Sequence, residues 1–156
     1  MGMFSARFTE DNQEVESRFR RIHTILVDHG YEVRMVAAKG SESFGDETVQ
    51  YLSELKRRSG VMLAVCTHHY AEMTSSEFSS YEELLFAKRH GLRVLPLRVV
   101  ETYPPRPPAG EGHKDVNYLS HGLIDMVLSP DRVFVDCRNK SDLEVAAAIA
   151  ECLHDR

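Results

Sequence analysis

Several kinds of segment are missing from this chain of 156 residues, and each absence excludes a class of protein. No stretch approaches the roughly 20 apolar residues that a membrane-spanning helix needs, so membrane insertion is not expected. The chain has no long run of Lys or Arg and a formal net charge of −5, which argues against a nucleic-acid surface. Cys66, Cys137 and Cys152 are odd in number and form no C-x-x-C motif, which is typical of reduced thiols in a cytoplasmic protein.

The composition that remains is that of a globular protein, with 42% apolar and 28% charged residues. A chain of this length buries about two thirds of the surface that its unfolded form exposes. We therefore expect residues 1–156 to form a single domain.

Five apolar segments alternate with helical patterns along the chain. The run 61–65 contains no polar residue, as expected for a strand that is covered on both faces of a parallel sheet. The other strands are predicted at 3–8, 31–36, 94–97 and 133–137. Helices are predicted from the polar cluster 9–12 to His29, from Asp46 to about residue 58, from about Ser80 to His90, within 119–128, and from the capping box Ser141-x-x-Glu144 through Leu153.

This alternation predicts the fold class. Strand–helix–strand units are right-handed and bury both faces of the sheet. We therefore expect an α/β fold, a flavodoxin-like doubly wound parallel sheet of about five strands with helices on both faces.

Polar residues follow the buried run 61–65, where ligands of parallel sheets bind. Thr67 and the two histidines come first, and Glu83 in the next helix can face them. Tyr70 is interpreted as a packing residue whose hydroxyl lies in water. His68 and His69 are adjacent and have no third ligand at a suitable spacing, so no metal site is predicted.

The order of several short motifs resembles that of the Toll/interleukin receptor (TIR) domain, and more closely that of the TIR domains that cleave NAD+. The likeness spans nearly the whole chain. The motifs are Ser5-Ala6-Arg7, Phe44-Gly45-Asp46, Thr67-His68-His69-Tyr70, Glu83-Leu84-x-x-Ala87, and Gly91 followed by Val94-Leu95-Pro96-Leu97.

One departure concerns the aromatic residue that stacks on the base. The family usually has Trp four residues before the Glu, whereas this chain has Ser79 there and contains no Trp. Phe78, one position earlier, is the candidate replacement. Ala6 likewise occupies a position where the family carries an aromatic residue.

The resemblance implies an NAD+ glycohydrolase that releases nicotinamide and gives ADP-ribose or its cyclic form, acting in immune or cell-death signalling. NAD+ is then a substrate, and no cofactor is expected. Self-association between TIR domains is implied, because a mobile loop or a neighbouring subunit completes the pocket. The implied residues are catalytic Glu83 and substrate-binding Arg7, Ser5, Phe44, Thr67 and Ser79.

A single carboxylate suits this chemistry. Nicotinamide in NAD+ is already a cationic leaving group, so its departure needs no general acid, only stabilisation of the positive charge that develops on the ribose.

Two alternatives stay open. First, Ser80-x-x-Glu83 is also a capping box, in which the Glu83 carboxylate would bond the backbone at the start of the helix. Ser79 and Glu82 have the same spacing, so Glu82 is the alternative carboxylate. If Glu83 is only a cap, the chain is a scaffold that signals by TIR–TIR association through the loop 37–45.

Overall fold

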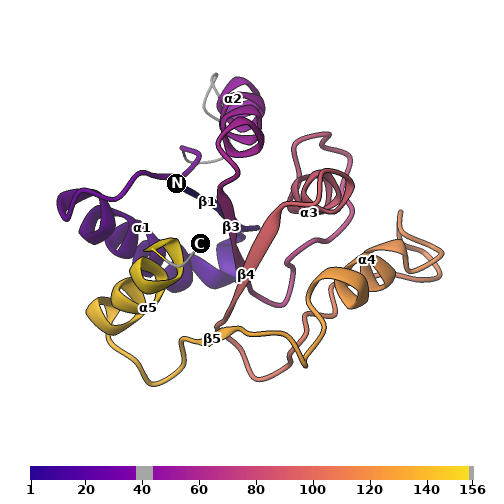
Figure 1. The fold of residues 1–156 in the computed structure, drawn as a ribbon. Coiled ribbons are helices and arrows are strands. Elements are labelled where there is room, and N and C mark those ends of the chain that lie inside the picture. Colours follow the sequence, from indigo (N-terminus) through magenta and orange to yellow (C-terminus); the bar gives the residue numbers. More distant parts are fainter. Residues whose placement is uncertain (38–43, 155–156) are drawn as a thin grey trace.

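The computed structural model describes residues 1–37 and 44–154 of the chain. A five-stranded sheet with the strand order β2-β1-β3-β4-β5 forms its centre (Figure 1). All neighbouring strands are parallel, which confirms the predicted α/β fold of flavodoxin-like, doubly wound type. The elements are β1 (Gly2–Ser5), the 3-10 helix η1 (Glu10–Asn12), α1 (Gln13–Asp28), β2 (Val33–Arg34), α2 (Phe44–Arg57), β3 (Val61–Cys66), α3 (Ser80–Arg89), β4 (Arg93–Arg98), α4 (Leu119–Val127), β5 (Val135–Asp136) and α5 (Asp142–His154).

The central strand β3 packs against helices on both faces. Leu63 and Val65 belong to the apolar cluster that contains the buried residues of α1 and α5, whereas Ala64 packs with those of α3 and α4. Met62 packs with the buried Leu55 of α2. Successive side chains of a strand point to opposite faces, so a strand covered on both sides has no place for a polar residue. Figure 1 shows α1 and α5 on one side of the sheet and α2, α3 and α4 on the opposite side.

Three strands are shorter than predicted. β2 and β5 lie at the two edges of the sheet, and each pairs with only one neighbour over two residues. The prediction that β1 extends over 3–8 is also wrong beyond Ser5. Ala6, Arg7 and Phe8 leave the sheet and line a cavity beyond its edge.

The ends of the helices follow local capping rules. The capping box before α5 is confirmed, because Glu144 N–H donates to Ser141 Oγ at 3.1 Å and Ser141 N–H donates to Glu144 Oε1 at 3.0 Å. The second helix begins at Phe44, two residues before the predicted cap Asp46. Asp46 instead lies in the first turn, where its negative charge faces the positive end of the helix dipole.

The proline-rich segment 99–118 contains no helix or strand, and a buried carboxylate anchors its end. Asp115 accepts hydrogen bonds from Leu119 N–H at 2.7 Å, Ser120 N–H at 2.9 Å and Ser120 Oγ at 2.6 Å. These bonds satisfy free donors at the start of α4 and hold the segment against it. None of the described helices is long and apolar enough to cross a membrane.

We predict that Ile22→Ala lowers the free energy of unfolding by about 2–5 kcal/mol, because the fully buried side chain of α1 leaves a cavity in the main core. Val27→Ala in the same helix is the matched control. Its side chain is 48% exposed, so the change should stay within about 0.5 kcal/mol. Urea unfolding of the two variants tests this, and equal losses would contradict the assignment of this face to the core.

Candidate functional site

A cavity of about 600 Å³ lies at the carboxyl edge of the sheet. Its walls come from β1 and the segments that follow β1 and β2, from α1, and from the segment that leads into the start of α3. Such an edge is where ligands of doubly wound sheets bind. The described lining residues are Phe4, Ala6, Arg7, Phe8, Thr9, Glu10, Gln13, Glu16, Arg20, Met35, Val36, Ala37, Thr74, Ser76, Phe78, Ser79, Ser80 and Glu83.

Glu83 lines this cavity from the first turn of α3, with only 5% of its surface exposed. Ser5 Oγ, at the end of β1, donates a hydrogen bond to Glu83 Oε1 at 2.7 Å. Tyr70 OH lies 2.9 Å from Ser5 Oγ. A serine hydroxyl has one proton to donate, so Tyr70 donates to Ser5 and Ser5 donates to Glu83.

The start of α3 does not use Glu83 as a cap. Ser79 is the N-cap residue, and its Oγ accepts from Glu82 N–H at 3.3 Å. Ser80 Oγ instead accepts from Ala71 N–H at 2.8 Å. Glu82 is exposed, so of the two adjacent carboxyl groups it is Glu83 that faces the cavity.

Burial sets the protonation of this hydrogen-bonded chain. It raises the pKa of Glu83 to about 8, because removal from water penalises the charged form more than the Ser5 hydrogen bond favours it. Burial likewise raises the pKa of Tyr70 well above its ordinary value, so its hydroxyl keeps the proton. In the free protein at neutral pH, Glu83 is therefore mostly an uncharged acid.

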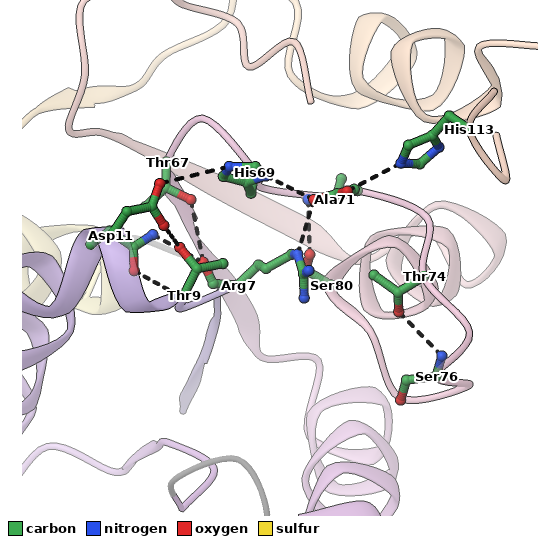
Figure 2. A network of polar contacts seen from close by, with 12 residues as sticks. Arg7, Thr9, Asp11, Thr67, His69, Ala71, Thr74, Ser76, Ser80 and His113 are labelled. Atoms are coloured by element: carbon green, nitrogen blue, oxygen red, sulfur yellow. Dashed lines mark hydrogen bonds and ion pairs between the residues drawn. The ribbon is translucent and has the colours of Figure 1, made fainter. Parts of the chain in front are cut away.

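Another carboxylate, Glu72, binds the cavity-lining residue Arg7 and has the opposite character to Glu83. Its Oε1 accepts from Arg7 Nε at 3.2 Å and from His69 Nδ1 at 2.8 Å, and its Oε2 accepts from His113 Nε2 at 3.1 Å. Burial alone would raise the pKa of Glu72, but these three bonds outweigh it and lower the pKa. Figure 2 shows Arg7, His69 and His113 converging on the turn after β3.

Phe78 is the aromatic side chain nearest to the position of the missing Trp, and it lines the cavity. A Cβ atom at Gly45 would lie 2.7 Å from Cε2 of the Phe78 ring, closer than carbon atoms approach. The ring therefore packs directly on the start of α2, where only glycine leaves room for it.

The predicted site residues divide into three groups. Glu83, Arg7 and Ser79 line the cavity. Ser5 and Thr67 are buried and are not among the described lining residues; Ser5 binds Glu83, and Thr67 Oγ1 lies 3.5 Å from the Arg7 carbonyl oxygen. Phe44 begins α2, but its side chain and most of the loop 37–45, residues 38–43, lie outside the described residues.

The sequence did not assign several residues to the site, and three of them, Tyr70, Glu72 and His113, form hydrogen bonds with residues that it did assign or with each other. Tyr70 is fully buried and bonded to Ser5, so the expectation that its hydroxyl lies in water is wrong. Glu72 and His113 belong to no sequence motif, and the hydrogen bond between them joins segments that are distant in the chain. Among the described residues, no group of His, Cys, Asp and Glu side chains is arranged to hold a metal ion.

Comparison with known proteins does not identify the family of this chain, because no protein-family model and no curated protein matches it. A function for this chain is therefore inferred from the residues of the site itself.

We predict that Glu83→Gln changes how stability depends on pH. The wild-type acid binds a proton in the folded state up to about pH 8, whereas in the unfolded chain it loses that proton near pH 4.5. Between about pH 4.5 and pH 8, the free energy of unfolding of the wild type therefore falls relative to that of the glutamine variant. The fall is roughly 1.4 kcal/mol per pH unit, and above about pH 8 the difference levels off.

Urea unfolding of both proteins at several pH values measures the difference. Glu82→Gln, the exposed neighbour, should show no such trend. A flat difference for Glu83→Gln would mean that burial does not hold this carboxyl group neutral.

Proposed function

We propose that the chain is an NAD+ glycohydrolase of TIR type, acting in the cytoplasm in immune or cell-death signalling, with Glu83 as its catalytic carboxylate. The observation that carries the proposal is a buried carboxyl group, bound to Ser5 and free of its own helix cap, in the wall of a cavity at the sheet edge. The cavity of about 600 Å³ lies within the usual range for small-molecule sites.

The reaction breaks the bond between ribose C1′ and the nicotinamide nitrogen. The bonding electrons leave with nicotinamide, which becomes neutral, and positive charge develops on the ribose. The Glu83 carboxylate stabilises that charge in a site where little water screens it. Water then adds at C1′ and loses a proton, which gives ADP-ribose, or the adenine ring adds and gives the cyclic product.

Other groups of the cavity fit the remaining parts of this substrate. Arg7 brings a permanently charged, planar guanidinium group, which suits a phosphate oxygen. Phe78 and Phe8 offer aromatic surface to the bases. Self-association through the loop 37–45 is part of the proposal, so the activity is expected to be greatest at high protein concentration.

We predict that concentrated protein releases nicotinamide from NAD+ and that Glu83→Gln lowers this rate at least about 100-fold, because the charge that stabilises the transition state is lost. Glu82→Gln, which removes an exposed carboxylate from the same turn, should stay within about twofold. Chromatography of the reaction mixture measures both. If the wild type releases no nicotinamide at any protein concentration, the chain is a TIR scaffold.

We also predict that kcat/KM for NAD+ rises about tenfold per pH unit below pH 8 and levels off near pH 8, because the free enzyme must lose the Glu83 proton. The cation of the bound substrate favours the carboxylate, so kcat should level off at a lower pH. Initial rates between pH 5 and pH 9, corrected for uncatalysed NAD+ breakdown, give both profiles. A kcat/KM profile that is flat from pH 5 upward would contradict the assigned role of Glu83.

A further inference from the structure

Glu72 gathers hydrogen-bond donors from three segments that are far apart in the chain. Arg7 follows β1, His69 belongs to the turn after β3, and His113 lies in the long segment before α4. The Glu72 side chain is 13% exposed, so most of it is withdrawn from water. A carboxylate satisfied by three donors in such a place is held in one orientation.

A second neighbour of His113 indicates which ring nitrogen accepts and which one donates. Asp115 N–H donates to His113 Nδ1 at 2.9 Å, so this ring nitrogen carries no proton. The proton of the neutral ring is therefore on Nε2, which donates to Glu72 Oε2. The buried Asp115 also caps α4, so His113 links Glu72 to a fixed part of the fold.

Arg7 is bound to Glu72 through Nε alone. Arg7 lines the cavity, and within residues 1–37 and 44–154 its side chain makes no other hydrogen bond, which leaves both terminal Nη groups without a protein partner there. A guanidinium group held at Nε presents its Nη atoms in a fixed direction, which matches the paired oxygens of a phosphate.

We propose that Glu72 is a positioning residue that aims Arg7 at the diphosphate of the substrate. The proposal rests on the proposed function for the identity of the ligand. It goes beyond that function because it states what orients Arg7. Glu72 holds the Arg7 side chain, and His113 of the segment 99–118 holds Glu72. Glu72 itself makes no contact with the substrate.

Glu72→Gln tests the proposal, because it replaces one acceptor oxygen by an NH₂ group that cannot accept from these donors. Glu77→Gln is the matched control, since Glu77 is an exposed carboxylate of the same loop. Calorimetry with ADP-ribose measures the diphosphate contact without any turnover. We expect the affinity of Glu72→Gln to fall about tenfold and that of Glu77→Gln to stay within about twofold.

Kinetics give a second readout that a purely structural role would not produce. KM for NAD+ should rise about tenfold in Glu72→Gln while kcat stays within about twofold, because the carboxyl group that acts on the ribose is untouched. Binding of nicotinamide riboside, which has no diphosphate, should be unchanged.

A third variant keeps the test decisive if Glu72→Gln fails to fold. Arg7→Lys keeps the positive charge but loses the Nε contact with Glu72, and it should weaken ADP-ribose binding to a similar extent. Where both single variants fold, the double variant should bind ADP-ribose no more weakly than either single variant.

The outcomes separate this proposal from the proposed function. Weaker ADP-ribose binding in Glu72→Gln supports the positioning role even if NAD+ is never cleaved. Unchanged or tighter binding overturns the role even if NAD+ is cleaved, and tighter binding would mean that Glu72 competes with the ligand for Arg7. A wild-type protein that does not bind ADP-ribose also overturns it.

Discussion

The hydrogen bond from Ser5 to Glu83 is the interaction on which the site depends. It joins the end of β1 to the first turn of α3, two elements that meet only because β1 and β3 are neighbours in the sheet. A buried carboxyl group without a partner is costly, and Ser5, itself bonded to Tyr70, supplies the partner. The bond thereby fixes the acid in the cavity wall, although the same side chain could have served as a helix cap.

Glu83 and Glu72 are held in opposite charge states. Among the described residues, Glu83 has one donor and a buried environment that raises its pKa to about 8, whereas Glu72 has three donors that keep its pKa low. When the surroundings move the pKa values of two carboxyl groups apart, one site can hold one group charged and the other neutral. Glu83 becomes charged most readily when a cation arrives next to it, and Glu72 stays charged to hold Arg7.

Much of the fold follows from local patterns, but the site does not. The uninterrupted apolar run of β3, together with the alternation of strand and helix patterns, predicts a parallel sheet, and Ser141 with Glu144 predicts the start of α5. The environment of Glu83 depends on Ser5, 78 positions away, so spacing alone left its role open between cap and catalyst. The bond between Glu72 and His113 crosses 41 positions and has no local signal at all. The lengths of the edge strands β2 and β5 were overestimated, because residue preference does not reveal whether a strand has one neighbouring strand or two.

The most direct test of the central claim is the pKa of Glu83, followed by NMR of ¹³C-labelled glutamate carboxyl groups. The free protein should give a value of about 8. Carbocyclic NAD+, which carries the nicotinamide cation but lacks the cleavable glycosidic bond, should lower that pKa, because the cation favours the carboxylate. NADH, whose dihydronicotinamide ring is neutral, should not lower it. A Glu83 pKa that responds equally to both ligands, or to neither, would contradict a role for this acid beside the cationic end of NAD+.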